Sequence, residues 1–224
     1  MHRFAKYLVA SALSVSLVTL IVGPSLLADD PAKPDPFVDR VVEFKKGDGG
    51  GNGEKELPGI VLGAPKGGGK LDSGDDVLSL GLGGVIILEF VDNEVFDGEG
   101  DDFLVFENPF LAAPGTDVNN GFFELGKVEV SDDGKEWVEF PFDTGTKEGC
   151  AGWHPVLSHP DKKEISPTDP KEAGGDAFDL ETVGLERVRF IRITDLNKVG
   201  GRNDTAGFDL DAVAAVHSRP RPKP

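Results

Sequence analysis

The chain's apolar residues fall in short runs of four to eight, separated by Gly, Pro, Asp and Asn, and this spacing most restricts its possible folds. Beyond residue 28 no stretch keeps a helical period over three turns, and Ala177 to Leu185 has room for only one short helical turn before Gly184. We therefore expect an all-β fold of seven to nine strands in one domain, which suits a β-sandwich with long loops. The predicted strands are Arg40–Lys45, Val77–Leu80, Val85–Val91, Phe103–Phe106, Lys127–Ser131, Glu136–Phe140, Arg187–Thr194 and Ala212–His217.

One of these runs changes phase. In Arg187–Thr194, Val188 and Phe190 alternate with arginines, whereas Ile191 and Ile193 occupy the opposite parity. Either a bulge near residues 190 and 191 keeps all four on one face, or the second half is covered on its other face. The sequence leaves both arrangements open.

The chain carries 40 acidic and 23 basic residues, a formal charge of −17. Nucleic-acid binding requires a basic face, so we exclude nucleic acid as a partner. The excess acid is instead a possible source of oxygen ligands for a cation.

The first 28 residues have the features of an export signal: basic residues from His2 to Lys6, an apolar run from Tyr7 to Val22, and Ala28 before a cleavage point. An uncleaved anchor is the alternative reading. No later apolar run approaches membrane length, so we expect an extracytoplasmic protein, secreted, periplasmic or at the cell surface, with no stable membrane span after cleavage. The predicted organisation is a signal peptide over 1–28, a Pro- and Asp-rich lead-in over 29–39, a β-sandwich domain over 40–217 and a basic, Pro-rich tail over 218–224.

Carboxylates crowd at two places where predicted strands begin or end. The segment Asp97–Asp102 places four acids and two glycines before a strand that Glu107 and Asn108 follow, and Asp209 and Asp211 share one parity of another strand. Such crowding is unfavourable unless a cation, water or hydrogen bonds screen it, and hard cations such as Ca²⁺ take six to eight oxygens from such loops. A solvated acidic turn and a capped strand entry are the alternatives.

The segment from Thr144 to Gly175 lacks periodicity and contains Cys150, Trp153, His154 and His159. An irregular insertion of this length in a compact domain is usually functional or disordered. The C-x₃-H-x₄-H spacing lacks the four close ligands of structural zinc, so we expect a buried Cys150 near Trp153 instead.

Four motifs carry a family resemblance over about residues 57–217. The hairpin from Lys127 to Trp137 and the strand Arg187–Thr194 resemble discoidin-like, galactose-binding-like jelly rolls. The ordered motifs Asp97–Asn108 and Gly207–Val213 are similar to those of bacterial exported proteins described as cell surface proteins. This resemblance implies a single jelly-roll β-sandwich, often with structural Ca²⁺, and carbohydrate or surface-polymer binding. The oxygen ligands of Ca²⁺ that the resemblance implies are Asp101, Asp102, Glu107, Asn108, Asp209 and Asp211.

We therefore expect an exported, calcium-stabilised binding module for a glycan or surface polymer rather than an enzyme. Trp153 is the expected sugar-binding residue, because aromatic faces pack on the C–H surfaces of pyranose rings. Trp137 is expected in the core of its hairpin. The alternatives are an extracytoplasmic hydrolase that uses carboxylates or a metal-bound water, and a purely structural surface protein.

Overall fold

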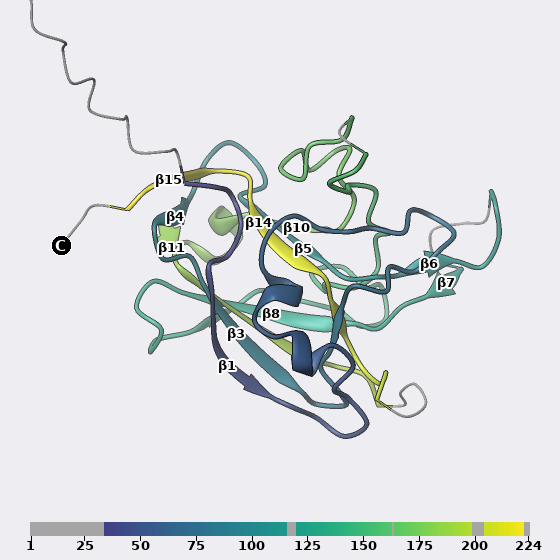
Figure 1. Cartoon of the computed structure of the whole chain (residues 1–224). Coiled ribbons are helices and arrows are strands. Elements are labelled where there is room, and N and C mark those ends of the chain that lie inside the picture. Colours follow the sequence, from purple (N-terminus) through teal and green to yellow (C-terminus); the bar gives the residue numbers. More distant parts are fainter. Residues whose placement is uncertain (1–33, 116–119, 163, 199–203, 222–224) are drawn as a thin grey trace, which may run out of the picture. The chain divides into compact units, whose positions relative to one another are not determined.

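The computed structural model describes residues 34–115, 120–162, 164–198 and 204–221 (Figure 1). They belong to one compact unit, Lys33–Pro224. The predicted signal peptide, 1–28, and the first part of the lead-in lie outside the described residues.

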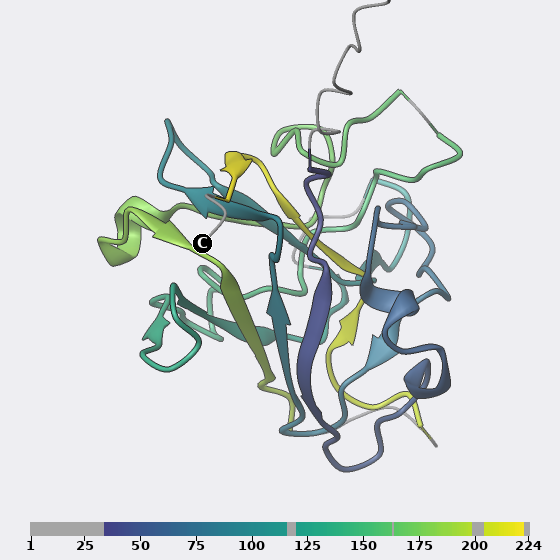
Figure 2. The same ribbon diagram turned by 60° about the vertical axis from the view of Figure 1, so that its left-hand side comes forward.

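The described residues form an all-β fold of antiparallel sheets, as the sequence predicts. The largest sheet has five strands in the order β1-β3-β12-β8-β9, and Figure 2 shows β1, β3 and β12 side by side. Its strands are β1 (Arg40–Lys45), β3 (Val85–Glu89), β8 (Gly126–Ser131), β9 (Val138–Glu139) and β12 (Phe190–Asp195).

A three-stranded sheet of β10 (Asp176–Phe178), β5 (Phe103–Phe106) and β14 (Ala212–Ala215) shares its core with the larger sheet. Alternate residues of β5 point to opposite faces. Phe103 and Val105 join the main core with Ile86, Val128 and other residues of the large sheet. The two sheets therefore pack against each other as layers of a sandwich.

The other face of β5 and β14 is also covered. Leu104 and Phe106 pack with Val156 and Ala173, which belong to the irregular insertion. Between β9 and β10 this insertion contains no described helix or strand, as the sequence predicts. It covers what would otherwise be an exposed apolar face.

Smaller elements complete the fold. They are the sheet β11 (Arg187–Val188), β4 (Asn93–Phe96) and β15 (Ser218–Pro220); the pairs β2 (Leu78–Ser79) with β13 (Asp209–Leu210) and β6 (Phe110–Leu111) with β7 (Gly121–Phe122); and the 3-10 helices η1 (Glu54–Glu56), η2 (Gly59–Val61) and η3 (Leu180–Val183). The helical turn expected before Gly184 is η3, which ends there in the left-handed conformation.

The phase change of Arg187–Thr194 is explained by a break between two strands. The chain leaves β11, which pairs with β4, and enters β12, which pairs with β3 and β8. Val188, Ile191 and Ile193 are all fully buried. The break at residue 189 brings Val188, Ile191 and Ile193 into one core cluster that does not include Phe190, so neither expected arrangement describes the segment fully.

The folded unit is longer at both ends than the predicted domain 40–217. Phe37 forms a bridge with Ala214, and Val38 is buried in the core, although both belong to the predicted lead-in. Ser218–Pro220 pairs with β4, so part of the predicted tail is a strand. These contacts join segments far apart in the chain, which local composition does not reveal.

Candidate functional site

Three carboxylates meet beside the ends of β5 and β13. Glu107 follows β5 directly, Asp209 begins β13, and Glu124 lies in the loop between β7 and β8. One oxygen of each lies within 4.8 Å of the others. We call Glu107, Glu124 and Asp209 the carboxylate pocket.

Strand pairing brings these residues together. Ala212 of β14 pairs with Phe106 of β5, and Asp209 of β13 pairs with Ser79 of β2. The loop that carries Glu124 approaches Gly152 so closely that a Cβ there would lie 2.2 Å from the Glu124 carbonyl oxygen. Only a glycine at residue 152 permits this approach, and its φ of +93° favours glycine as well.

Backbone donors satisfy only part of the pocket's oxygens. Asp209 N donates to Glu107 Oε1 at 3.2 Å, and Gly207 N donates to Glu124 Oε1 at 3.1 Å. Glu107 Oε2, Asp209 Oδ1 and the neighbouring Ser79 Oγ are buried and have no hydrogen-bond partner among the described residues. Glu107 is 1% exposed and Asp209 8%. Buried carboxylate oxygens without partners are costly, so this arrangement favours a positive ligand.

Burial raises the pKa of each acid in the pocket, and repulsion from other pocket acids adds to the rise for Glu107 and Glu124. The pKa of Glu107 lies well above its ordinary value because of burial and then the charges of Asp209 and Glu124. Burial raises the pKa of Glu124 to about 8, and that of Asp209 to about 6. The side chains of Ser79 and Asn108 lower the pKa of Asp209 and so oppose the effect of burial. Neither side chain makes a hydrogen bond of standard geometry with Asp209 Oδ1. Without a cation, the three groups therefore carry fewer than three negative charges at neutral pH.

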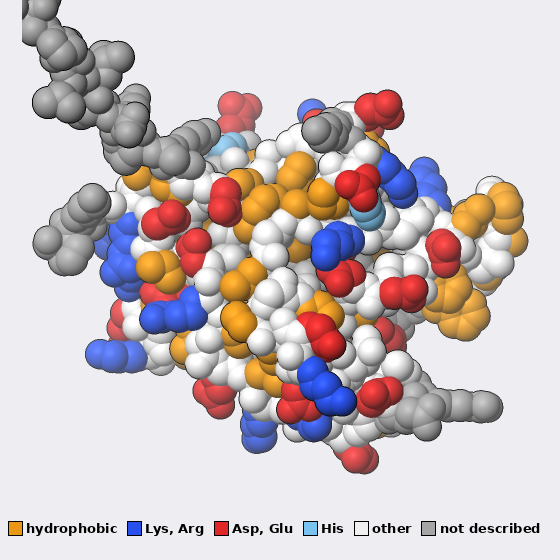
Figure 3. Space-filling model, in the orientation of Figure 1, with side chains coloured by type: hydrophobic (Ala, Val, Ile, Leu, Met, Phe, Trp, Pro, Cys, Tyr) orange, Lys and Arg blue, Asp and Glu red, His pale blue; other side chains and the backbone are white. Residues whose placement is uncertain are grey.

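The carboxylate pocket opens into a cavity of about 350 Å³. Besides the three acids, the lining residues are Ser73, Asn108, Phe110, Phe122, Phe123 and Thr205. Phe110 and Phe122 stack with ring centroids 4.8 Å apart on the β6–β7 hairpin, and Phe122 is 63% exposed. Figure 3 shows hydrophobic side chains gathered on this projection, at the right of the view. The cavity is thus lined by the three carboxylates and by an aromatic rim, the stacked rings of Phe110 and Phe122.

The six predicted ligands divide among separate places. Glu107, Asn108 and Asp209 line the same cavity, whereas Asp101, Asp102 and Asp211 do not line it. Sequence reasoning missed Glu124, which follows Phe122 and Phe123 in a loop without any acidic motif. Only the packing of that loop against residues 152 and 207 brings its carboxylate to the pocket.

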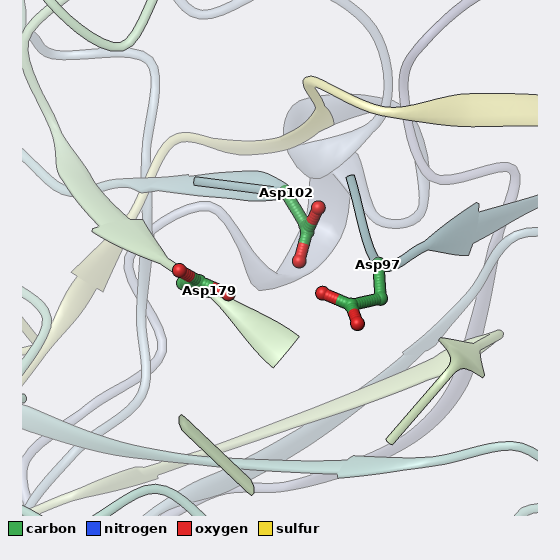
Figure 4. Close-up of side chains that lie close together, drawn as sticks. All are labelled: Asp97, Asp102 and Asp179. Atoms are coloured by element: carbon green, nitrogen blue, oxygen red, sulfur yellow. The ribbon is translucent and has the colours of Figure 1, made fainter. Parts of the chain in front are cut away.

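Asp102 joins three separate segments of the chain through hydrogen bonds to its carboxylate. Its Oδ1 accepts hydrogen bonds from Gly98 N and His217 Nδ1, both at 2.8 Å, and its Oδ2 accepts one from Leu180 N at 2.8 Å. Figure 4 shows its carboxylate near those of Asp97 and Asp179, and one oxygen of each lies within 4.8 Å of the others. Because Asp102 already has three donors, this second acidic group lacks the unpaired buried oxygens of the carboxylate pocket.

Asp101 and Asp211 have other surroundings. The pKa of Asp101 is raised by burial and by the charges of Asp179 and Asp102. Both oxygens of Asp211 accept from Lys66 N, at 3.1 and 2.8 Å, and burial raises the pKa of Asp211 to about 7. Asp209 and Asp211 share a parity in the sequence, but β13 ends at Leu210 and the two carboxylates reach different neighbours.

The insertion places Cys150, His154 and His159 in different surroundings, where each has its own neighbours. Cys150 is buried, as expected, and burial raises its thiol pKa to about 11. His154 Nδ1 lies 2.7 Å from Asp176 Oδ1, and His159 Nδ1 accepts from Asp161 N at 3.1 Å. Trp153 is half-buried, with its ring centroid 3.8 Å from that of His154.

The sequence matches no protein-family model, and no curated protein sequence matches it. Among the described residues, no helix has the length and apolar character needed to cross a membrane. Fold and pocket together define the described unit as a layered β protein with one buried, incompletely partnered carboxylate cluster.

Proposed function

We propose that the protein is an exported binding module whose carboxylate pocket holds Ca²⁺ and whose aromatic rim receives a glycan or surface polymer. The observation that carries the proposal is the pair of unpartnered oxygens, Glu107 Oε2 and Asp209 Oδ1, each on a side chain at least nine-tenths buried. A divalent cation would compensate both charges at once and replace the missing donors.

The donor set favours a hard cation. Three carboxylates and the neutral oxygens of Ser79, Asn108 and Thr205 lie at or beside the cavity, and no Cys or His lines it. Calcium prefers six to eight oxygens in flexible geometry, whereas zinc favours nitrogen and sulfur ligands. Because the pocket is open, water or a bound ligand would complete the coordination.

The rim supports a polyhydroxylated ligand. Hydroxyl pairs of a sugar would coordinate the cation while a C–H face of the ring packs on the Phe110–Phe122 stack. Trp153 remains a further proposed contact. Lys147 Nζ lies 5.2 Å from the Phe123 ring centroid and 5.6 Å from that of Trp153, so one lysine contacts both Trp153 and an aromatic residue that lines the cavity.

We also propose that the fold is a galactose-binding-like jelly roll and that the protein is exported to the cell surface. A jelly roll of the galactose-binding-like kind agrees with the packed antiparallel sheets and with the Asp133-Gly134 turn between β8 and β9. Export as a cell surface protein depends on the N-terminal signal sequence.

The cation proposal is tested by thermal melting of the purified protein in EDTA and in excess Ca²⁺. At a hundredfold excess over Kd, binding to the folded state alone adds about 2.7 kcal/mol, which raises Tm by about 5–10 °C. Asp209→Asn should abolish most of this rise, whereas Asp211→Asn, a neighbouring buried acid with its own partner, should retain it. An absent rise in the wild type, or an equal rise in both variants, would overturn the proposal.

The glycan proposal is tested on a glycan array with and without Ca²⁺. Phe122→Ala and Trp153→Ala should each weaken binding, and EDTA should remove it. Trp137→Ala is the matched control, because Trp137 packs against Arg192 with the guanidinium carbon 4.3 Å from the ring centroid, away from the cavity lining. Binding that none of these changes affects would assign the ligand to another surface.

A carboxylate hydrolase is the second candidate function. A pKa of about 8 for Glu124 beside one of about 6 for Asp209 is the arrangement of a general acid and a base, and both line the same cavity. Release of reducing sugar ends by the wild type, lost in Glu124→Gln with folding retained, would favour this function over simple binding.

A further inference from the structure

A second cavity, distinct from the carboxylate pocket, lies between the insertion, β6 and β10. Its volume is about 460 Å³. The titratable side chains that line it are all basic: Lys70, His154 and Lys171. In a chain of charge −17 this is an unusual local concentration of positive charge. The apolar part of the lining includes Leu111, Leu157, Pro155 and Pro170.

A buried aspartate orients the histidine in this cavity. Asp176 is 3% exposed, and its Oδ2 accepts from Gly152 N at 2.6 Å and from Trp153 N at 3.2 Å. These bonds leave Oδ1 to His154 Nδ1, at 2.7 Å. With Nδ1 turned to Asp176, Nε2 lies on the other side of the ring, on a side chain that is 42% exposed.

The basic side chains beside His154 favour an anion in this cavity. Asp176 faces its Nδ1, while Lys70 and Lys171 line the same cavity and make no ion pair with a described acidic residue. Glu107 is a further charge near Asp176, since both are buried and their charges repel. Asp176 Oδ1 is paired with His154 Nδ1, so the two lysines remain available to a ligand.

We propose that this second cavity binds a small organic oxyanion, a carboxylate or a phosphate ester. Lys70, Lys171 and His154 Nε2 contact the oxyanion, and Leu111, Leu157 and the prolines pack against the apolar part of its body. Charge-assisted hydrogen bonds in a partly enclosed cavity are the usual means of recognising such groups. Binding of the oxyanion does not require a cation in the carboxylate pocket.

The test is calorimetric titration of the purified protein in EDTA, at low ionic strength, with glucuronate, inorganic phosphate and glucose as separate probes. We expect saturable binding of glucuronate, of phosphate or of both, and none of glucose. Binding of both anions indicates recognition of the oxyanion alone, whereas binding of glucuronate only indicates that the sugar body is also recognised. Binding of neither, or equal binding of glucose, would overturn the proposal.

Variants locate the binding. Lys171→Gln and His154→Gln should each weaken it about tenfold, the loss expected for one charge-assisted hydrogen bond. His154→Gln retains an N–H donor for Asp176, so the variant changes the contact at Nε2 and keeps the bond to the buried carboxylate. Lys55→Gln removes the same charge from η1, outside the cavity, and should bind as the wild type does. Equal weakening by Lys55→Gln would show that binding depends only on the net charge of the protein. That result would contradict the proposed site.

Discussion

The backbone N–H of Asp209 donates to Glu107 Oε1 at 3.2 Å and so joins two carboxylates that lie 102 residues apart in the chain. This bond satisfies one oxygen of Glu107 and leaves Oε2 beside Asp209 Oδ1 with no donor for either. Two buried acids are thus held together at an open cavity, and their repulsion is part of the folded state.

The burial of Asp209 predicts how stability depends on pH in the absence of cations. The pKa of Asp209 rises from 3.8 to about 6 on folding, so the folded protein binds more protons than the unfolded chain between these values. The free energy of unfolding in EDTA should therefore fall as pH increases from about 4 to 7, with Asp209 contributing about 3 kcal/mol. Urea denaturation across this range measures the fall. Asp209→Asn should flatten the curve; an identical slope in wild type and variant would contradict the assignment.

Calcium affinity should change with pH in the opposite direction. Because Glu124 has a pKa of about 8, a cation must displace protons from the pocket at neutral pH. We expect Kd to decrease from about pH 6 to about pH 8, with proton release that calorimetry in buffers of different ionisation enthalpy detects. Glu124→Gln should reduce this proton release. Equal release from the variant would place the protons elsewhere.

Asp102 should matter for stability and leave cation binding unchanged. In Asp102→Asn the new amide N–H₂ faces a backbone N–H of Gly98 or Leu180, so at least one buried donor loses its acceptor. We expect a loss of about 3 kcal/mol in the free energy of unfolding, measured by urea denaturation, with the Ca²⁺-induced rise in Tm retained. Asp97→Asn, at an exposed neighbour, should change stability by less than about 0.5 kcal/mol. Loss of the Ca²⁺ response in Asp102→Asn would restore Asp102 as a metal ligand.

Gly152→Ala should damage the carboxylate pocket through the backbone. A Cβ at residue 152 would meet the Glu124 carbonyl oxygen at 2.2 Å, so the loop that carries Glu124 must move. We expect lower thermal stability and weaker Ca²⁺ binding. Gly100→Ala is the matched control, because φ is +83° there and nothing lies within 4 Å of the added Cβ. The control should lose stability through backbone strain alone and bind Ca²⁺ as the wild type does.

Cys150 should be unreactive in the folded protein. Its thiol is buried, and a pKa of about 11 leaves almost no thiolate at neutral pH. Iodoacetamide should label it slowly under native conditions and rapidly in denaturant, as mass spectrometry would show. Rapid native labelling would instead support a nucleophilic role.

Several strands could be predicted because their signal is local. Arg40–Lys45 and Phe103–Phe106 coincide with β1 and β5, and the Asp133-Gly134 turn joins β8 to β9. The short strands β6 and β7 were missed, because two residues give no periodicity.

The sequence by itself determined the alternation of short apolar runs with turns, and hence the all-β class, together with the crowding of acids near strand ends. Only the tertiary structure decided which acids share a pocket. Asp102 and Asp211 acquired backbone donors, while Glu107 and Asp209 were left partly unpartnered and Glu124 was brought to them from an unrelated loop. Hydrogen-bond satisfaction depends on contacts between segments far apart in the chain, and spacing along the sequence does not specify those contacts.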